Sequence, residues 1–512
     1  MHRRLAGIFS VPTVATLAAA LSATLTLHAD NSPARHSTAA IVATLRSALA
    51  STNEEPAAAS DGAIMTGDDV AHLGSASWSY HSTSPPAVCV SPRTTAQVSS
   101  LLRAASALNL AVVPRAGGTS LEGQTVPPRD ARPVVVVDFQ RMNRVVSVSA
   151  ADMTADVEPG VGWEALNAAL APHGLVFPVD PGPGAQIGGM AGTNCSGTRA
   201  CRHGSFKNNV LGLEAVAADG TVFRTGSHAR KTSAGLDLTS LLVGAEGSLA
   251  IITRATLRLA PAPAAIRVIS TPFATTRDAL AAAAAAVQAG VPLLAAEFMD
   301  GPMCGAVGAG LLKDGAVPTV LWKLAAASDA ALNADAALLR GVVDRAGARG
   351  WTEADADTAD DLWEARKTAL FSAGVARAHD VDDARVLTTD VCVPLSALPA
   401  LLERFDAHER ETRGASRVAV FAVAHAGDGN AHHFIVFAPS DLAEVSRARY
   451  LADWLAAEAI ALNGTCTGEH GVGEGKLKFL DAELGPGNAA VSRTIKHALD
   501  PLNILNPGKK IL

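Results

Sequence analysis

Short apolar runs alternate with glycine-rich loops through the first half of the chain. The runs Leu110–Val113 and Pro133–Asp138 are bounded by turn residues, a pattern typical of short buried strands. Trp163–Leu170 has helical spacing, and the usual stop signals Pro172 and Gly174 follow it. This half is therefore predicted to mix strands and short helices.

The second half shows longer amphipathic elements. Strands are predicted at Ile266–Ser270, Ala295–Met299 and Thr319–Leu324, and helices at Thr276–Ala289 and Ala330–Ala346. Strands that alternate with helices in this way indicate an α+β cap domain of the ferredoxin-like kind.

A hairpin is predicted over residues 419–437. Two apolar strands flank Gly427–Asn430, which is a strong turn signal. The turn is expected to bring His425 and His432 close together across the two strands. His433 should point to the opposite face, because side chains alternate along a strand.

A chain of 512 residues is too long for one hydrophobic core, so several domains are expected. The stretch Pro261-Ala262-Pro263 marks a composition change and a boundary. The expected divisions are a targeting segment and linker (1–62), a first domain (80–262), a cap domain (263–463) and a C-terminal segment (464–512).

Composition excludes some classes of protein. Hydrophobic residues make up 48% of the chain and charged residues 18%, as in folded globular proteins. The net charge of -7, from 42 basic and 49 acidic residues, argues against a nucleic-acid partner. The six cysteines form no CxxC pair, so they are read as reduced thiols rather than ligands of a zinc ribbon or an iron–sulfur cluster.

The N-terminus fits three kinds of segment. Arg3 and Arg4 precede an uncharged run, and no acidic residue appears before Asp30, as in a mitochondrial transit segment. The run is nearly long enough for a membrane anchor, and a secretory signal cleaved near Ala29 is the third alternative. Mitochondrial targeting is the preferred interpretation, with membrane association through the N-terminus left open. Residues 30–62 show no clear period and are expected to be a linker.

Three loops are rich in glycine and hydroxyl residues: Pro114–Gln124, Phe177–Thr198 and Leu242–Thr253. Taken alone, the first is equally a tight turn or a concavity of free N–H groups that holds a phosphate. Three such loops, each close to a strand, indicate one long ligand threaded between them. A dinucleotide has that length.

These loops, in this order, resemble the FAD-binding domain of the vanillyl-alcohol oxidase / PCMH flavoprotein superfamily over roughly residues 80–262. The resemblance implies an α+β protein with a two-part PCMH-type FAD-binding domain, a cap domain and a C-terminal segment that returns to the flavin. Thr119 stands where relatives with covalent flavin carry His, which implies non-covalent FAD. Ala116 and Leu236 depart from the usual Gly and Tyr; neither removes an expected phosphate contact, and the effect of Leu236 on the flavin pocket is left open.

The FAD-binding residues implied by this resemblance lie on the loops and near the C-terminus. They are Pro114, Arg115, Ala116, Gly117, Gly118, Thr119, Ser120, Gly123, Gln124, Pro181, Gly182, Gly188, Gly189, Met190, Gly192, Thr193, Ser196, Gly197, Gly204, Asn209, Val210, Glu246, Gly247, Ile251, Ile252 and Asn506.

A carboxylate and an imidazole, Glu469 and His470, stand side by side in a glycine-flanked loop. Glu469 is a candidate third ligand for a metal ion held by His425 and His432, and His470 is a candidate general base beside it. The plainer alternatives are a solvated polar turn and two histidines that pack and cap a hairpin. Two His and one carboxylate suit zinc, manganese, iron or cobalt.

The C-terminal motifs narrow the resemblance. His425-x6-His432, Thr467–Gly471 and Asp500–Lys509 look like those of the FAD-linked 2-hydroxyacid dehydrogenases. That resemblance implies a divalent metal, with zinc or manganese preferred, on His425, His432 and Glu469, and His470 as the base. The motif Leu-Trp-x-x-Arg implies that Arg366 binds the substrate carboxylate; the alternative is an ordinary surface arginine beside Lys367.

The stretch Thr388–Pro394 looks like the mitochondrial D-lactate branch, because the hydroxyglutarate branch places Lys where Thr388 stands. The resemblance therefore implies oxidation of a small D-2-hydroxy acid, D-lactate to pyruvate, by proton abstraction and hydride transfer to flavin, with cytochrome c or another acceptor taking the electrons. The alternatives are a D-2-hydroxyglutarate or glycolate dehydrogenase and a non-catalytic flavin-binding subunit. Glu474 stands where relatives have a neutral residue.

Overall fold

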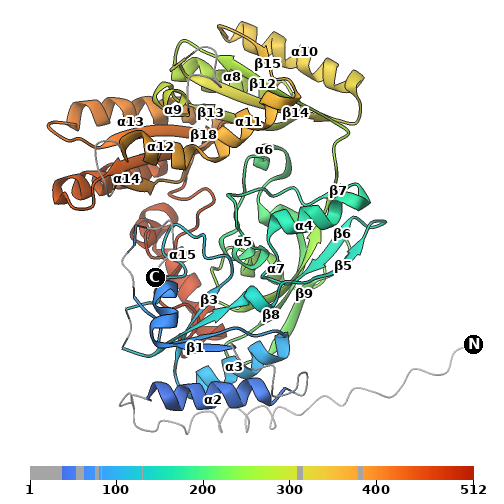
Figure 1. Cartoon of the computed structure of the whole chain (residues 1–512), viewed down its shortest axis with the longest axis vertical. Coiled ribbons are helices and arrows are strands. Elements are labelled where there is room, and N and C mark those ends of the chain that lie inside the picture. The colour runs from blue at the N-terminus through green and yellow to red at the C-terminus, as the bar shows by residue number, and fades with distance from the viewer. Residues whose placement is uncertain are drawn as a thin grey trace, which may run out of the picture.

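The computed structural model describes residues 37–52, 63–74, 80, 81, 84–129, 131–307, 315–378 and 384–511. The chain forms a lower body that contains the three glycine-rich loops and an upper body that contains the cap (Figure 1). The fold is α+β, as the sequence predicts.

The lower body begins with a four-stranded sheet of order β1-β2-β4-β3. Its members are β1 (Ile64–Thr66), β2 (Val88–Val90), β3 (Ala111–Arg115) and β4 (Val134–Asp138). The last three are parallel and fully apolar on the side that meets helix α3 (Thr95–Ala107). The predicted strands at 110–113 and 133–138 are thus confirmed as β3 and β4, and β3 delivers the first glycine-rich loop.

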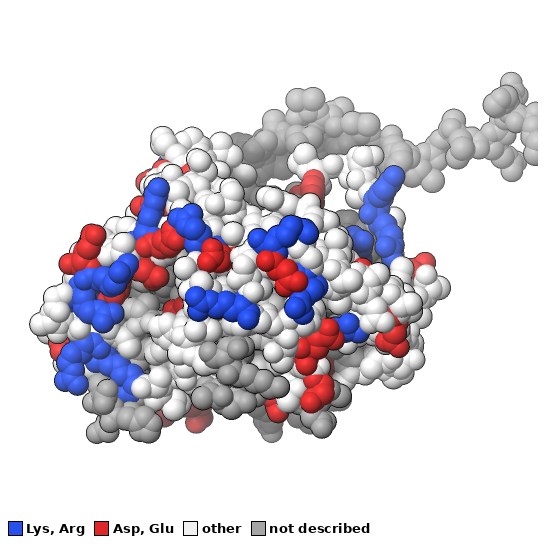
Figure 2. Space-filling view, turned by 90° about the horizontal axis from the view of Figure 1, so that it is seen from above, with Lys and Arg blue, Asp and Glu red and all other residues white. Residues whose placement is uncertain are grey.

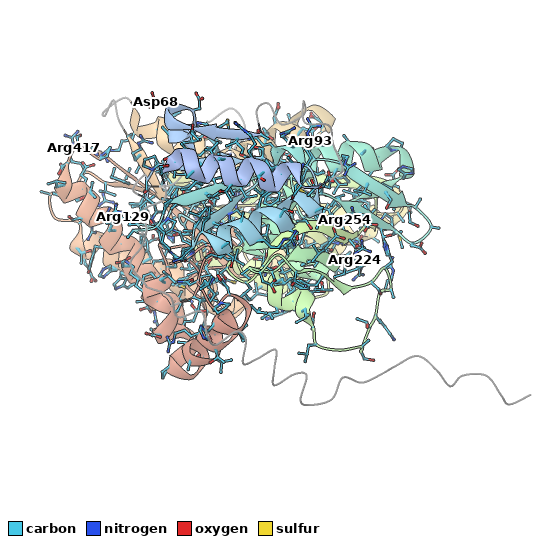
Figure 3. All side chains as sticks on the ribbon, turned by 90° about the horizontal axis from the view of Figure 1, so that it is seen from below. Asp68, Arg93, Arg129, Arg224, Arg254 and Arg417 are labelled. Atoms are coloured by element: carbon cyan, nitrogen blue, oxygen red, sulfur yellow. The ribbon has the colours of Figure 1, made fainter. Side chains whose placement is uncertain are left out.

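Helix α2 (Thr38–Ala50) corrects the expectation of a linker over residues 30–62. Ile41, Leu45 and Leu49 recur every four residues, are buried, and share one core with α3. Alanine, which is also apolar, occupies several positions on the other faces of the helix, so the sequence shows no clear helical period there. Figure 1 places α2 beside α3 at the end of the molecule away from the cap, a face seen from below in Figure 3.

A second, antiparallel sheet completes the lower body and carries the other two glycine-rich loops. Its order is β5-β6-β10-β8-β9. Helices α4 (Trp163–Leu170) and α5 (Ile187–Thr193) pack on it, and α4 matches the predicted helix residue for residue. The strands are β5 (Val145–Ser149), β6 (Thr154–Val157), β8 (Val210–Val216), β9 (Val222–Gly226) and β10 (Ile251–Arg258).

The cap is built on one sheet of order β15-β12-β14-β13-β18-β19-β16. Its first half runs β12–α8–β13–β14–α10–β15, which is a split β-α-β-β-α-β unit of the ferredoxin-like kind. The elements are β12 (Ala265–Pro272), α8 (Thr276–Gln288), β13 (Leu293–Met299), β14 (Thr319–Ala326), α10 (Asp329–Arg345) and β15 (Thr352–Glu353). Each predicted strand and helix of this region is confirmed to within a few residues.

The second half of the cap repeats the arrangement without a sequence repeat. Its elements are β16 (Arg385–Thr388), α13 (Leu398–Thr412), β18 (Ala419–His425), β19 (Asn430–Phe437) and α14 (Leu442–Ala461). The two halves join where β13 pairs with β18, and Glu297 lies directly opposite His425 in that pairing. Helices α8, α10, α13 and α14 cover one face of the sheet.

The opposite face of the cap sheet is only partly covered. Helices α9 (Gly301–Ala306), α11 (Ala356–Lys367) and α12 (Ala369–Ala378) pack on it through a smaller core. This face looks towards the lower body (Figure 1). The site described below lies between the two.

After α14 the chain returns to the lower body, as the sequence predicts. Helix α15 (Leu480–Leu499), interrupted at Gly485, lies beside the lower body in Figure 1. Val112 of β3 donates its N–H to the carbonyl of Ile504 at 2.7 Å, and Asn506 donates to the carbonyl of Val112 at 2.8 Å. The C-terminal segment thus extends the edge of the first sheet.

The predicted targeting segment falls mainly on residues 1–36, which lie outside the described residues. Among the helices that are described, none is both long enough and apolar enough to cross a membrane. On the cap, Figure 2 shows basic and acidic side chains interspersed, and the cap helices carry ion pairs such as Arg340–Asp344 and Arg277–Glu403. All six cysteines are free.

Candidate active site

A cavity of about 380 Å³ lies between the glycine-rich loops and the open face of the cap sheet. Residues from all three loops line it, together with cap residues and the C-terminal segment. The expected FAD-binding residues that line it are Pro114, Arg115, Ala116, Gly117, Gly118, Thr119, Ser120, Gln124, Pro181, Gly182, Gly188, Gly189, Met190, Gly192, Thr193, Gly197, Glu246, Gly247, Ile251, Ile252 and Asn506.

The loops meet where side chains would not fit. A Cβ atom on Gly247 would lie 2.3 Å from Pro114, and one on Gly117 would lie 2.5 Å from the carbonyl oxygen of Gly184. Gly247 also has φ of +71°, a conformation that glycine adopts without strain. The three loops therefore form one continuous wall, as the hypothesis of a single long ligand requires.

Five expected FAD-binding residues do not line the cavity. Ser196 instead donates a hydrogen bond to Glu469 at 2.7 Å. Asn209 bonds the carbonyls of His203 and Ser205 and so holds a loop closed, while Gly204 ends α6 (Ala200–His203) with φ of +70°. Val210 begins β8, and Gly123 lies beside Glu474.

The three expected metal ligands converge. Nε2 of His425 and Nε2 of His432 each lie 3.2 Å from Oε1 of Glu469, and the two histidines are 6% and 5% exposed, respectively. The imidazole rings stand nearly perpendicular, with centroids 5.3 Å apart. The predicted hairpin provides both histidines, and His433 occupies the opposite face, where it packs on Phe405.

The other ring nitrogens fix how these histidines are protonated. Nδ1 of His432 lies 3.0 Å from the carbonyl oxygen of Thr389, which can only accept, so Nδ1 carries the hydrogen. Nδ1 of His425 lies 2.8 Å from Oε1 of Glu297 in the same way. Nε2 of each ring, which faces Glu469, is thus the nitrogen left to bind a metal ion, and metal-binding histidines characteristically have such partners on the second nitrogen.

Charges in this cluster fit a divalent cation. Burial alone would raise the pKa of Glu469, yet the hydrogen bonds and charges of His425 and His432 hold that pKa well below its ordinary value. The carboxylate is therefore ionised and shares its oxygen with two imidazoles. A cation that replaced the shared protons would meet two nitrogens and one oxygen, a donor set that suits zinc or manganese.

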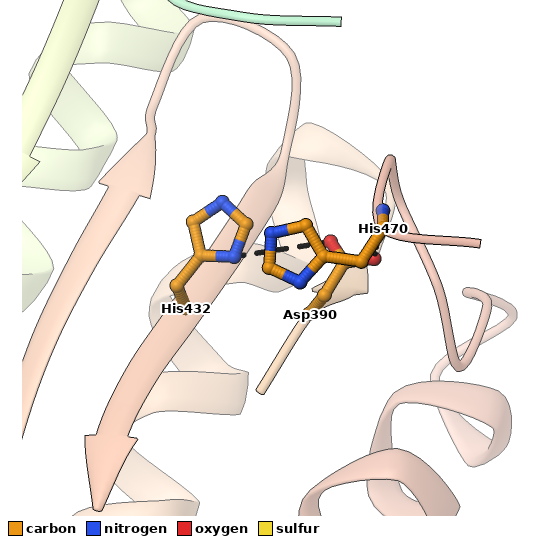
Figure 4. Close-up of side chains that lie close together, drawn as sticks. All are labelled: Asp390, His432 and His470. Carbon is orange, nitrogen blue, oxygen red and sulfur yellow. Dashed lines mark hydrogen bonds and ion pairs between the residues drawn. The ribbon is translucent and has the colours of Figure 1, made fainter. Parts of the chain in front are cut away.

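A second group of three, Asp390, His432 and His470, also brings its ligand atoms within 4.8 Å of one another (Figure 4). Asp390 is already engaged, because Oδ2 accepts hydrogen bonds from Thr467 Oγ1 and from the N–H groups of Glu469 and His470. The nitrogen of His432 that faces it is Nδ1, at 3.9 Å, which carries a hydrogen. This group is therefore a support for the loop rather than a ligand set.

His470 stacks on His432, with ring centroids 4.9 Å apart. Burial lowers the pKa of His470, and the nearby carboxylate of Asp390 opposes this only in part. Its backbone carbonyl accepts a hydrogen bond from Gln124 Nε2 at 2.7 Å, so the first glycine-rich loop holds the backbone of His470 in place. A neutral imidazole that faces the cavity is suited to accept a proton.

Arg366 lines the cavity from α11 and is 6% exposed. Its Nη2 lies 2.7 Å from Oε2 of Glu297, but the angle gives no hydrogen bond, and Nε and Nη2 have no hydrogen-bond partner among the described residues. A buried guanidinium with unpaired N–H groups is a ready site for a carboxylate. The alternative of an ordinary surface arginine is wrong.

The structure shows where Leu236 and Glu474 lie, the two residues that depart from the pattern of the family. Leu236 is 86% exposed and is not among the residues that line the cavity. Glu474 lies 2.7 Å from Nζ of Lys509 and 3.4 Å from Nδ1 of His81. Against the effect of burial, these hydrogen bonds lower the pKa of Glu474 to about 2, and the ionised carboxylate ties the C-terminal segment to residue 81.

Sequence reasoning missed Glu297, Asp390 and Lys476. Lys476 is buried and donates to the carbonyl oxygen of Asp390 at 2.9 Å, while its charge also faces Glu122 at 3.3 Å. A signal did exist, because Glu297 is the one charged residue within the apolar strand Leu293–Met299 and isolated buried charges are rare unless paired.

Two family models match the chain. One describes an FAD binding domain and matches residues 86–226, and the other describes the C-terminal domain of FAD linked oxidases and matches residues 262–510. D-lactate dehydrogenase [cytochrome], mitochondrial, of Arabidopsis thaliana is 38% identical over 83% of this chain and 73% of its own length. Probable D-lactate dehydrogenase, mitochondrial, of Danio rerio is 38% identical over 87% and 90%. A glycolate oxidase subunit of Bacillus subtilis is 30% identical over 86% and 93%.

Solved structures share the architecture at low identity. 4-Ethylphenol oxidase from Gulosibacter chungangensis superposes with a TM-score of 0.74 at 18% identity, covering 92% of this chain and 97% of its own. p-Cresol methylhydroxylase gives 0.70 at 15% identity, covering 92% and 96%. These likenesses concern the fold alone.

Proposed function

The chain belongs to the family of FAD-linked oxidases, and we propose that it oxidises a D-2-hydroxy acid, D-lactate before others, to the corresponding 2-oxo acid. The observation that carries the proposal is the meeting of three features in one cavity. These are a buried arginine whose Nε and Nη2 lack a hydrogen-bond partner among the described residues, a His/His/Glu triad, and an imidazole beside the triad, all in the cavity that the glycine-rich loops line.

Arg366 binds the carboxylate of the substrate in this proposal. Its Nε and Nη2 provide two parallel N–H groups, the geometry that holds a carboxylate with two hydrogen bonds. The hydroxyl group then lies towards His425, His432 and Glu469. His470 takes the proton of that hydroxyl, and Asp390 holds the loop of His470 through two backbone N–H groups.

The triad His425, His432 and Glu469 would hold the divalent cation, and the three glycine-rich loops would hold FAD without a covalent link at Thr119. When bound, FAD supplies the two-electron acceptor and the cation supplies positive charge that favours loss of the hydroxyl proton. The substrate loses that proton and the hydrogen on C2 with its electron pair, which gives the 2-oxo acid.

The choice of D-lactate rests on Thr388 and on the relatives. Thr388 lines the cavity and is uncharged, so this side chain offers no positive charge to a second carboxylate on the substrate. Phe434 pairs with Thr388 across β16 and β19, and Leu370 and Phe371 add further apolar side chains to the cavity lining. Both features favour a small apolar side chain over a diacid.

The electron acceptor and the compartment are inferred from the relatives' names. Relatives from Arabidopsis thaliana and Saccharomyces cerevisiae are D-lactate dehydrogenases [cytochrome] of mitochondria. We take cytochrome c as the acceptor and the mitochondrion as the compartment.

The test is an anaerobic visible spectrum of the FAD-loaded protein with Zn²⁺ or Mn²⁺, recorded before and after separate additions of D-lactate, L-lactate, glycolate and D-2-hydroxyglutarate. We expect D-lactate to bleach the oxidised-flavin bands and L-lactate to leave them unchanged. Bleaching by glycolate or D-2-hydroxyglutarate in place of D-lactate would overturn the assignment of Thr388. Bleaching by none of the four would favour a non-catalytic flavin-binding subunit.

The base is tested in the same assay. His470→Ala should slow bleaching by about 10²–10⁴-fold, the usual contribution of a general base, while the oxidised-flavin spectrum stays that of the wild type. Removing the metal with a chelator should slow bleaching as well, and restored metal should recover it only when His425 is intact. Unchanged bleaching in His470→Ala would remove His470 from its role.

A further inference from the structure

Glu297 occupies an unusual place in the cap sheet. It stands in the middle of β13, is 0% exposed, and is flanked by Ala295, Ala296 and Phe298. In the antiparallel pairing of β13 with β18, its partner is His425. Directly opposed residues of paired strands present their side chains on the same face, which here is the face that looks into the cavity.

The two oxygens of Glu297 serve two different sites. Oε1 lies 2.8 Å from Nδ1 of His425, a residue of the proposed metal triad. Oε2 lies 2.7 Å from Nη2 of Arg366, the proposed carboxylate-binding residue. One buried carboxylate therefore joins the group that would hold the metal to the group that would hold the substrate.

We propose that Glu297 is a positioning residue that couples these two sites: it keeps His425 in the tautomer that can bind a metal, and it competes with the substrate carboxylate for Arg366. This inference rests on the proposed function for the identity of the metal triad and of Arg366. Neither the family models nor the relatives' names assign Glu297 a role.

The first effect follows from hydrogen-bond chemistry. A carboxylate only accepts hydrogen bonds, so Nδ1 of His425 must donate to Glu297, and Nε2 is the nitrogen that can give up its proton to bind a metal ion beside Glu469. An amide at this position could donate to Nδ1 instead, which would place the hydrogen on Nε2 and block the metal. Loss of such outer partners typically lowers metal affinity by about 10–100-fold.

The second effect follows from charge. Arg366 already faces one carboxylate, that of Glu297. A substrate carboxylate that enters the cavity must therefore share the guanidinium of Arg366 with Glu297. Without the charge of Glu297, Arg366 is left with its full charge for an incoming carboxylate. Carboxylate binding should therefore become tighter in the same variant in which metal binding becomes weaker. A purely structural residue would weaken both.

The experiment uses the FAD-loaded full chain stripped of metal. Zn²⁺ alone is titrated in competition with a chromophoric chelator, and propionate, a carboxylate without a hydroxyl, is titrated into the metal-free protein with flavin absorbance as the readout. We expect Glu297→Gln to bind Zn²⁺ about 10–100-fold more weakly and propionate more tightly than the wild type. Arg366→Met should bind Zn²⁺ at least as tightly as the wild type and should lose propionate binding.

A matched control is available on two helices of the cap, α12 and α14. Glu444 is also a buried carboxylate paired with a buried arginine, Arg377, at 2.7 Å. Glu444→Gln removes a comparable charge and should leave the affinities for Zn²⁺ and propionate unchanged. If both Gln variants weaken Zn²⁺ binding equally, the effect is general destabilisation and the proposal is wrong.

The double variant Glu297→Gln/Arg366→Met guards against a failure to fold, because removing both partners leaves no buried charge unpaired. Its Zn²⁺ affinity should remain low. Wild-type Zn²⁺ affinity in either Glu297 variant would overturn the proposal. The failure of the proposed function can be told apart from the failure of this inference. If Glu297→Gln weakens Zn²⁺ binding but D-lactate does not bleach the flavin of the wild type, Glu297 keeps its positioning role and D-lactate is rejected as the substrate.

Discussion

Replacing Asp390 by Asn should loosen the loop that carries Glu469 and His470. Asp390 is 0% exposed, and its Oδ2 accepts hydrogen bonds from Thr467 Oγ1 at 2.7 Å, the N–H of Glu469 at 3.0 Å and the N–H of His470 at 2.9 Å. The substitution keeps the shape of the side chain and removes its charge. The loss is therefore electrostatic.

The magnitude can be worked from these contacts. A hydrogen bond to a charged group contributes about 1.5–3 kcal/mol and a neutral one about 1 kcal/mol, so each of the three loses about 1 kcal/mol. Lys476 keeps Glu122 at 3.3 Å and is not left unpaired. The new amide nitrogen would face Nδ2 of Asn430, which donates to Asp390 Oδ1 at 2.8 Å and is held by the carbonyl of Val391 at 2.9 Å, so this contact adds to the loss. The free energy of unfolding should fall by at least about 3 kcal/mol.

The assay is urea denaturation of the FAD-loaded protein at pH 7, followed by tryptophan fluorescence, to which Trp322 and Trp454 in the core of the cap contribute. For a slope of about 3 kcal/mol/M, the midpoint should fall by about 1 M. Asp300→Asn is the control. Asp300 accepts two backbone N–H groups, but burial raises its pKa to about 7, so it carries only part of a charge to lose.

A midpoint for Asp390→Asn equal to that of the wild type, or no lower than that of Asp300→Asn, would refute this account of the loop. The flavin spectrum should stay unchanged in both variants, since neither residue lines the cavity.

Three further expectations concern other parts of the molecule. Burial lowers the pKa of Lys323 from 10.5 to about 7. The folded protein therefore binds this proton less tightly than the unfolded chain does. As a result, the free energy of unfolding decreases as the pH falls from above 10.5 towards 7. Lys323→Met should melt higher than the wild type at pH 7, and a difference that is as large at pH 11 would contradict the cause. Leu45→Ala in α2, at a position 0% exposed, should lower the free energy of unfolding by about 2–5 kcal/mol in urea denaturation, whereas no change would mean that α2 does not support the sheet. Leu236→Tyr should leave the flavin spectrum and FAD affinity unaltered, because Leu236 is 86% exposed, and any spectral shift would place it at the flavin.

Sequence could predict the parts of the site that are local. A turn of four residues and the alternation of side chains along two strands are enough to bring His425 and His432 together and to send His433 to the other face. The glycine-rich loops were likewise visible because each is a continuous stretch. The amphipathic elements of the cap gave its ferredoxin-like units for the same reason.

The partners of these residues could not be read in the same way. Glu297 precedes His425 by 128 residues, and only the pairing of β13 with β18 makes them neighbours. That pairing joins two structural repeats with no common sequence, so no periodic pattern marks it. Asp390 lies two residues after Thr388, within the stretch Thr388–Pro394 that bears on substrate choice. Its role as a hydrogen-bond acceptor exists only because the loop of His470 folds back against it.

The junction of the C-terminal segment with the first sheet bears on how the protein is made. Asn506 donates to the carbonyl of Gln124, 382 residues earlier in the chain. At about 5–20 residues per second, a ribosome needs roughly 20–75 seconds to synthesise the intervening chain. During that time the edge of β3 and the first glycine-rich loop lack their last partners while the whole cap is translated. Tight FAD binding should therefore follow synthesis of the C-terminal segment, and FAD should protect the completed chain from proteolysis far better than the nascent one.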